Sequence, residues 1–235
     1  MNILILNGSP RGEKSNTFKI TSAFMDGLNA VSKNIVQTIT INKAQIEPCL
    51  GCFSCWTKTP GKCAIGDDMA SFIQKYTESD LVIWSFPLYY FGMPSKIKGF
   101  LDRLFPLLLP EIKMNADGIC RHPTRYDLSH QRHILISTCG FCSTRGNYEA
   151  LVCQFEMMFG DCLTKIICPE GELFRTPKER TGEYLIHVTD AGKEFVSQGK
   201  ISAQTQNKLD ELLLPADAFI ESANASWDIT DNHTT

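Results

Sequence analysis

The 235-residue sequence predicts an α/β fold built on a doubly wound parallel sheet. Two observations carry this prediction. Apolar runs of strand length alternate with stretches of helical period over residues 2–168, and the first of these runs is apolar at consecutive positions, as in a strand buried on both faces. Sheets of this type bind ligands at the carboxyl ends of their strands. The loops after the first, third and fourth strands are therefore the places to search for chemistry.

Five segments are predicted as strands: Asn2–Leu6, Ile35–Ile41, Leu81–Trp84, Ile134–Ser137 and Thr164–Cys168. Helices are expected between them at Thr17–Val31, Asp67–Tyr76, Ser95–Phe105 and Asn147–Phe159. Asp67 is the expected N-cap of the second helix. Further helical signals follow at Ala191–Gln198, Ser202–Leu213 and Ala216–Ala225.

These elements divide the chain into a domain over residues 1–170 and a C-terminal helical extension with a tail over 171–235. The domain contains a cysteine-rich loop over 48–66 and a long crossover over 106–131. The crossover is interpreted as a lid or a subunit contact, because long loops without regular structure are uncommon unless they have a function.

The composition excludes several classes of protein. Hydrophobic residues make up 43% of the chain and charged residues 21%, which excludes a disordered chain, a coiled coil and a collagen-like fibre. A net charge of −3 argues against a nucleic-acid or anionic-membrane partner. The N-terminus lacks the pattern of a signal peptide, and no apolar stretch is long enough to span a bilayer. A cytoplasmic location is predicted, where the ten cysteines point to metal or redox chemistry rather than disulfides.

The loop after the first strand, residues 8–17, predicts an anion site at the start of a helix. The P-loop pattern needs Gly directly before Lys-Ser, but Glu13 stands there. The dinucleotide fingerprint needs Gly-x-Gly-x-x-Gly, but Gly8 and Gly12 have the wrong spacing. What remains is a loop that wraps a monoester phosphate, with Ser9, Arg11, Ser15, Asn16 and Thr17 as its candidate ligands. A plain strand–helix turn with Ser15 as N-cap is the alternative.

The loop after the third strand contains three successive aromatic residues, Tyr89, Tyr90 and Phe91, and then Gly92. They can pack on their own domain, or they can form the wall for a flat ring. The next helix is expected to present a solvated face with Lys96, Lys98, Asp102 and Arg103. Arg103 can alternatively pair with Asp102 or reach a subunit interface.

Three motifs together resemble the NAD(P)H-dependent FMN reductase branch of the flavodoxin-like proteins. They are Asn7-Gly8-Ser9-Pro10-Arg11 with Ser15-Asn16-Thr17, then Pro87-Leu88-Tyr89-Tyr90-Phe91-Gly92-Met93-Pro94, then Lys98-Gly99-Phe100-Leu101-Asp102-Arg103. The resemblance covers roughly residues 1–171. It makes the expected fold a flavodoxin-like three-layer sandwich whose five-stranded parallel sheet has the order 2-1-3-4-5.

The resemblance also implies a function. FMN phosphate would lie at Ser9, Arg11, Ser15, Asn16 and Thr17. The flavin ring would lie against Pro87, Leu88, Tyr89, Tyr90, Phe91 and Gly92, and against Thr138, Cys139 and Gly140. The protein would be an FMN-dependent oxidoreductase that passes electrons from NAD(P)H through FMN to a quinone, a flavin or another small acceptor. No catalytic side chain is expected, because flavin N5 carries the chemistry. A homodimer or homotetramer is implied.

Four cysteines in the cysteine-rich loop follow a metal-ligand spacing. Cys49, Cys52 and Cys55 are separated by two residues each, and Cys63 follows, so that four thiolates can reach one cluster. This arrangement resembles the compact motif of iron–sulfur flavoproteins, a subgroup that carries a [4Fe-4S] cluster beside FMN. Zinc bound by four cysteines and a loop without metal remain open alternatives.

The other cysteines and two histidines have weaker signals. Cys139 and Cys142 stand just before a helix and can form either a redox pair or a plain flavin-contact loop. Burial as small hydrophobic residues is expected for Cys153, Cys162 and Cys168, whereas Cys120 has no assignment. His122 and His130 in the crossover can approach the flavin as proton donors or lie on the surface.

Two other functions remain open at this point. One is an iron–sulfur/FMN electron-transfer protein that serves ferredoxin-type partners without direct NAD(P)H turnover. The other is a sensor that keeps FMN or a cluster for regulation.

Overall fold

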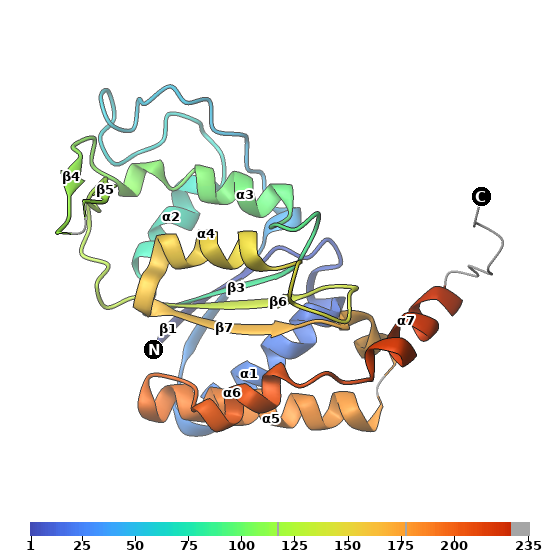
Figure 1. Ribbon diagram of the computed structural model, residues 1–235. Helices are drawn as coiled ribbons and strands as arrows, with labels where there is room; N and C mark the ends of the chain where they lie inside the picture. Colours follow the sequence, from blue (N-terminus) through green and yellow to red (C-terminus); the bar gives the residue numbers. More distant parts are fainter. Residues whose placement is uncertain (117, 177, 227–235) are drawn as a thin grey trace, which may run out of the picture.

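A five-stranded parallel sheet lies at the centre of the computed structural model, which describes residues 1–116, 118–176 and 178–226 (Figure 1). Its strands are β1 (Asn2–Asn7), β2 (Ile35–Thr40), β3 (Leu81–Pro87), β6 (Arg132–Thr138) and β7 (Leu163–Cys168). They are ordered β2-β1-β3-β6-β7. Since β6 and β7 are the fourth and fifth strands of this sheet, the predicted order 2-1-3-4-5 is confirmed.

Helices cover both faces of the sheet (Figure 1). One face carries α2 (Met69–Thr77), α3 (Ser95–Asp102) and α4 (Glu149–Phe159). The other carries α1 (Asn16–Val31), α5 (Glu179–Gln198) and α6 (Ala203–Asp210). The predicted three-layer sandwich is therefore confirmed. None of the helices in the described ranges is long and apolar enough to cross a membrane.

Two apolar cores form because alternate residues of a strand point to opposite faces. In β1, Ile3 and Ile5 join the core under α1 and α5, whereas Leu4 and Leu6 join the core under α2, α3 and α4. Trp84 of β3 is fully buried in this second core. Burial on both faces explains why β1 and β3 read as continuous apolar runs, whereas the edge strand β2 is largely exposed and alternates.

The helix α5 is longer than the predicted segment Ala191–Gln198 and packs against α1. The two helices touch at glycines: a Cβ added to Gly192 would lie 2.3 Å from the Phe24 carbonyl oxygen, and one added to Gly27 would lie 2.0 Å from the Thr189 carbonyl oxygen. The sandwich thus draws on residues beyond 170. The division into residues 1–170 and 171–235 remains a prediction.

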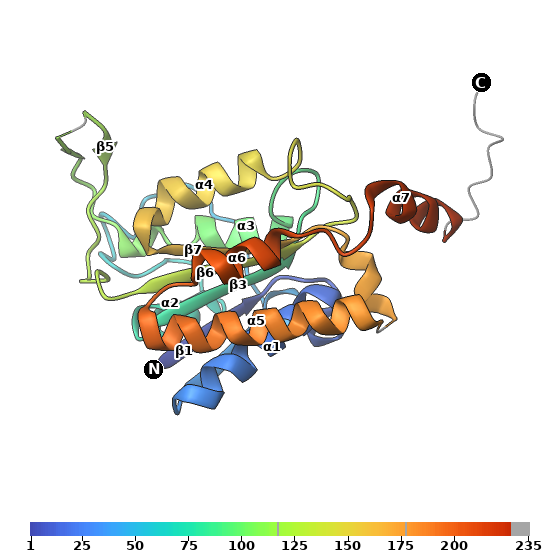
Figure 2. The same ribbon diagram turned by 60° about the horizontal axis from the view of Figure 1, so that its bottom comes forward.

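The segment that leads to α7 (Ala216–Ala225) is anchored by a buried carboxylate. Glu170 is inaccessible to solvent, and its side chain accepts hydrogen bonds from the amides of Leu213 (2.6 Å) and Leu214 (3.2 Å). In both views α7 lies toward the end of the sheet at which the strand arrows point (Figures 1 and 2).

The crossover contains structure that the sequence pattern did not indicate. A short antiparallel hairpin, β4 (Lys113–Met114) and β5 (Cys120–Arg121), stands away from the sandwich (Figure 2). Short 3-10 turns occur at Gly12–Lys14, Ile41–Lys43, Phe105–Leu107, Gly160–Cys162 and Gly171–Arg175.

Candidate functional site

A small cleft opens where β1, β3 and β6 end. Its lining consists of Ser9, Arg11, Ser15, Asn16, Thr17, Pro87, Leu88, Tyr89, Thr138, Cys139, Gly140, Gly171 and Glu172. All the predicted cofactor-binding residues except Tyr90, Phe91 and Gly92 line this cleft. Gly171 and Glu172 were not predicted. Their place just after the last strand was the signal that could have found them, because the carboxyl ends of parallel strands share one edge.

The phosphate-loop hydroxyls keep protons that they can donate. Ser15 is the N-cap of α1, and its Oγ accepts a hydrogen bond from the Phe18 amide (3.1 Å). Ser9 Oγ accepts from the Arg11 amide (3.4 Å). A hydroxyl that accepts one bond still has its own O–H to donate. The amides of the first turn of α1 have no acceptor within the helix, so this loop suits an anion such as a phosphate monoester.

Hydrogen bonds join the loops around the cleft. Thr138 contributes twice: its Oγ1 lies 2.6 Å from Thr17 Oγ1, and its carbonyl accepts from the Leu88 amide at 2.8 Å. Asn16, predicted as a phosphate ligand, instead donates its side-chain Nδ2–H to the Gly171 carbonyl at 2.8 Å. A Cβ added to Gly171 would lie 2.7 Å from Thr138 Cβ, so these two residues are in close contact.

The aromatic loop after β3 is a tight two-residue turn. Tyr89 and Gly92 exchange backbone hydrogen bonds of 2.9 and 3.0 Å, and the residues between them, Tyr90 (φ 49°) and Phe91 (φ 64°), have left-handed backbones. This conformation costs roughly 1–2 kcal/mol for each non-glycine residue. The turn leaves Tyr90 99% exposed and sets the Phe91 ring almost parallel to that of Phe141, with centroids 6.5 Å apart. Backbone strain of this kind is often found at binding sites.

The two cysteines after β6 are both free thiols. Cys139 is buried, and burial raises its pKa above the ordinary value of 9.0. A buried thiol with a raised pKa is a poor nucleophile, so Cys139 is not the activated member that a redox-active pair would require. Cys142 is half-buried.

The remaining cysteines follow the prediction only in part. Cys168 is buried as expected, but Cys162 is half-buried and Cys153 is exposed. The prediction for Cys153 was wrong because α4 buries Leu151 and Phe155, so the residue between them in the sequence faces away from the sheet. Cys120 lies exposed in β5.

The histidines of the crossover do not line the cleft. His122 packs against Trp56 of the cysteine-rich loop, with ring centroids 4.9 Å apart, and its Nδ1 lies 2.9 Å from the Glu111 carbonyl oxygen. His130 is exposed. Neither therefore lies among the residues that surround the predicted flavin position.

The four cysteines predicted as cluster ligands line one cavity between the cysteine-rich loop and the end of α3. Cys55 is buried, Cys63 is half-buried, and Cys49 and Cys52 are exposed. The loop turns sharply between them through Gly51 (φ 61°) and Phe53 (φ 51°). Burial and the nearby Cys63 thiol raise the pKa of Cys55.

A buried ion pair lies beside this cavity. Arg103 was predicted on a solvated face, but it is only 1% exposed and lines the cavity. It pairs with Asp67 rather than Asp102, through Nη1–Oδ2 (2.7 Å) and Nη2–Oδ1 (2.8 Å). Asp102 pairs instead with Lys98 on the surface. The helix α2 begins at Met69, two residues after the predicted start at Asp67, and its N-cap is Asp68 rather than Asp67.

The four cysteines do not form a ready-made site for a single metal ion in the described residues. In the part of the chain that the structure describes, no three His, Cys, Asp or Glu side chains lie close enough together to hold one metal ion. A zinc site needs its four ligands around one ion at about 2.0–2.3 Å. An iron–sulfur cluster instead binds each thiolate to a different iron, so its cysteines stand apart around one space. The arrangement of the four cysteines around one cavity is compatible with this second geometry.

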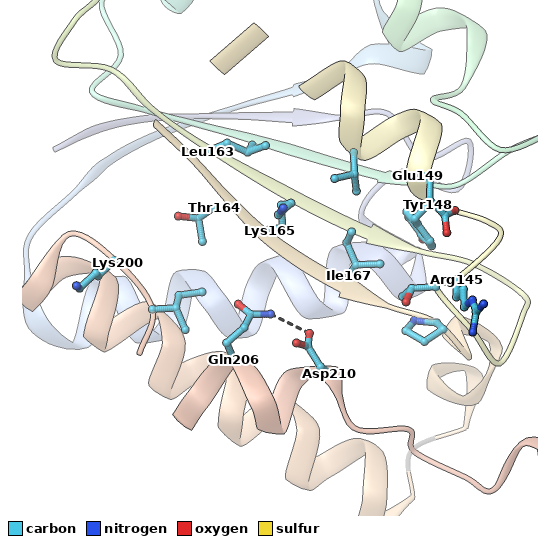
Figure 3. Close-up of a pocket in the computed structure, with 14 residues that line it drawn as sticks. Arg145, Tyr148, Glu149, Leu163, Thr164, Lys165, Ile167, Lys200, Gln206 and Asp210 are labelled. Carbon is cyan, nitrogen blue, oxygen red and sulfur yellow. Dashed lines mark hydrogen bonds between the residues drawn. The ribbon is translucent and has the colours of Figure 1, made fainter. Parts of the chain in front are cut away.

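A second groove lies along the outer edge of β7, between α4 and α6 (Figure 3). Lys165 and Ile167 of the strand line it together with Gln206, which donates a hydrogen bond to Asp210 (2.9 Å). None of the predicted cofactor residues lines this groove, and it has no assigned role.

Comparison with known proteins gives a consistent result. A family model described as flavodoxin-like fold matches residues 1–162. The chain is 34% identical over 109 residues to an iron–sulfur flavoprotein of Methanocaldococcus jannaschii, covering 46% of this chain and 53% of that protein. It is 26% identical over 110 residues to an FMN-dependent NADH:quinone oxidoreductase of Pseudoalteromonas atlantica, covering 44% of this chain and 54% of that protein. The chain thus spans about half the length of these two curated relatives.

Among solved structures, the NAD(P)H:quinone oxidoreductase from Methanothermobacter marburgensis matches with a TM-score of 0.60 and 16% identity. The match covers 83% of this chain and 97% of that one. At this identity the likeness shows the fold alone.

Proposed function

Because this chain belongs to the flavodoxin-like fold family, we propose that it is an FMN-dependent oxidoreductase that passes electrons from NAD(P)H to a small acceptor such as a quinone or a flavin. One observation carries the proposal: the loops after β1, β3 and β6 gather around a single cleft that combines a phosphate-type anion site with the loop that leads into an aromatic turn. The names of the curated relatives, which include an NADH:quinone oxidoreductase, support the same reaction class.

The chain's own groups would bind and orient the cofactor. Ser9 and Ser15 would donate their hydroxyl protons to the FMN phosphate, together with the first amides of α1, and the exposed Arg11 would add positive charge. Pro87, Leu88 and Tyr89 on one side and Thr138, Cys139 and Gly140 on the other would hold the ring. Bound FMN would supply hydride transfer, which needs no acidic or basic side chain from the protein.

We extend the proposal to the cysteine cavity, which would hold a [4Fe-4S] cluster through Cys49, Cys52, Cys55 and Cys63. The support is their arrangement around one cavity and the relative named as an iron–sulfur flavoprotein. This cavity also favours a second candidate function, an iron–sulfur/FMN electron-transfer protein that receives electrons from a ferredoxin-type partner. We further propose a cytoplasmic homodimer or homotetramer, in which the crossover forms the subunit contact.

An anaerobic purification tests these proposals together. The expected preparation shows flavin absorbance, contains iron and sulfide, and oxidises NADH or NADPH when a quinone is added. Absence of flavin after incubation with FMN would overturn the main proposal. Flavin without iron or sulfide, even after reconstitution, would overturn the cluster alone. A flavin-loaded protein that oxidises neither nucleotide but accepts electrons from reduced ferredoxin would establish the second candidate in place of the first.

A further inference from the structure

Arg103 lies at the edge of the cysteine cavity with its guanidinium group held in a fixed orientation. Nη1 donates to the Glu47 carbonyl (2.6 Å) as well as to Asp67, and Nη2 donates to the other oxygen of Asp67. Asp67 is fixed in turn by the amides of Glu47 (2.9 Å) and Met69 (3.1 Å). Two-pronged pairing of this kind defines the plane of the guanidinium group.

One donor of this group is left over. The Nε–H of Arg103 is buried and has no oxygen or nitrogen partner, while the guanidinium group as a whole interacts with the Cys63 thiol. A buried donor without an acceptor destabilises the folded state, and more so when the group is charged. Such a group persists in native structures mainly where a bound partner or a function accounts for it.

The residue that carries this donor lies beside the four cysteines of the cavity. Arg103 lines the cavity together with Cys49, Cys52, Cys55 and Cys63, whereas Asp67 does not. Burial acts to lower the pKa of Arg103, but hydrogen bonding with Asp67 and the proximity of Cys63 raise it above the ordinary value. The charged guanidinium group therefore lies at the same cavity as the four thiols.

We propose that Arg103 is a positioning residue that donates its Nε–H to sulfur in this cavity, orients Cys63 as a ligand and raises the reduction potential of the group that the four cysteines hold. This inference rests on the proposed [4Fe-4S] cluster. Hydrogen bonds to sulfur and net charge are two of the properties that set the potential of iron–sulfur clusters, and partners behind the ligands also set metal affinity.

The test compares reconstituted wild-type protein with Arg103→Gln, Arg103→Lys, Asp67→Asn and Lys98→Gln. Iron and sulfide content are measured first, and the cluster potential is then followed by electron paramagnetic resonance in a redox titration. Arg103→Gln should favour the oxidised cluster by at least tenfold, which is a fall of about 59 mV for a one-electron couple. Asp67→Asn removes a negative charge behind the arginine and should shift the potential in the opposite direction.

The other two variants distinguish between possible causes of a change in potential. Arg103→Lys separates the effect of charge from that of hydrogen bonding, and Lys98→Gln separates a charge at the cavity from one on the surface. Arg103→Lys keeps the charge but loses the fixed Nε–H, so its potential should lie between those of wild type and Arg103→Gln. It also serves as the informative variant if Arg103→Gln fails to fold. Lys98→Gln removes an exposed charge one turn earlier in α3 and should leave the potential unchanged.

The possible negative results distinguish a wrong role for Arg103 from the absence of the cluster. A fully loaded Arg103→Gln or Arg103→Lys variant with the wild-type potential would overturn the role of Arg103 and leave the cluster in place. The same would follow if Asp67→Asn and Arg103→Gln moved the potential in the same direction, since that result indicates a purely structural pair. Wild-type protein without iron or sulfide after reconstitution would overturn this inference together with the cluster, while FMN binding would remain a separate result.

Discussion

The hydroxyl oxygens of Thr17 and Thr138 lie 2.6 Å apart, which joins the first turn of α1 to the end of β6 across the floor of the cleft. One hydroxyl must donate to the other, so the pair still has one proton to offer to a ligand. Both residues are almost completely buried.

Replacement of Thr17 by valine should weaken FMN binding. The change keeps the shape of the side chain but removes the hydroxyl, and a hydrogen bond to a charged group contributes about 1.5–3 kcal/mol. We expect the dissociation constant of FMN to rise by roughly 10- to 100-fold. Quenching of flavin fluorescence during titration of the apoprotein measures it.

Thr21→Val is the matched control for this prediction. Thr21 lies one turn further along α1, and its hydroxyl pairs with that of Ser85 at 2.8 Å, but it does not line the cleft. This variant should lose stability like Thr17→Val and bind FMN as wild type does. Equal affinities for the two variants would contradict the assigned role of Thr17.

The strained turn at Tyr90 and Phe91 predicts that a variant with a relaxed turn is more stable but binds its ligand more weakly. Asn-Gly is the preferred pair for a two-residue turn in which both residues have positive φ. The double variant Tyr90→Asn/Phe91→Gly should raise the free energy of unfolding by about 1–2 kcal/mol and weaken flavin or acceptor binding. Urea denaturation measures the first effect and fluorescence titration the second. A less stable double variant would show that the aromatic side chains stabilise the turn despite its backbone.

The contact between α1 and α5 predicts opposite effects of the same substitution at two glycines of one helix. Gly192→Ala places a Cβ 2.3 Å from a backbone oxygen of α1, so it should destabilise the protein by about 1–3 kcal/mol. Gly182 faces open space, and Gly182→Ala should stabilise α5 by about 0.5–1 kcal/mol. Urea denaturation of the two variants measures both values. Similar losses at both positions would contradict the close packing at Gly192.

The buried His133 predicts a pH dependence of stability. Burial lowers its pKa from 6.5 to about 3, and its Nδ1 accepts a hydrogen bond from Trp84 Nε1 (3.4 Å). The unfolded chain therefore binds a proton below pH 6.5 that the folded chain does not bind until about pH 3. Stability should fall as the pH falls through this window, by about 2 kcal/mol between pH 7 and pH 5 from this residue alone.

His133→Asn tests this prediction because asparagine retains an acceptor for Trp84 but does not titrate. Its free energy of unfolding, measured in urea at several pH values, should fall by about 2 kcal/mol less between pH 7 and pH 5 than that of wild type. His130→Asn changes an exposed histidine and should retain the wild-type slope. An unchanged slope in His133→Asn would mean that other groups cause the acid loss.

The sequence predicts the layers of this fold because apolar strands that alternate with helices need cover on both sides, whereas the strand order is implied by the family resemblance. The same local reasoning fails where a contact joins distant residues. Arg103 belongs to a run of charged residues and was predicted to be exposed to solvent. It is instead buried, because it pairs with Asp67, which is far away in the sequence. The strands β4 and β5 have two residues each, too few for a periodic pattern.

The candidate site shows the same difference between features set by local sequence and features set by contacts between distant residues. The loops after β1, β3 and β6 could be predicted because a parallel sheet places the ends of its strands at one edge. The roles of single side chains within these loops could not. Asn16 lies in the predicted phosphate loop, but its amide group binds the carbonyl of Gly171, which is brought near only when β7 joins the sheet.

The contact between Thr138 and Gly171 couples the evolution of two distant positions. A side chain at residue 171 would collide with Thr138, at 2.7 Å between Cβ atoms, so a relative that carries alanine or serine there needs a shifted backbone or glycine at 138. Because Thr138 also joins the loops after β1 and β3, glycine at this position would give up the hydroxyl partner of Thr17. Substitutions at these two positions should therefore occur in pairs among related sequences, and a single exchange at either one should be rare.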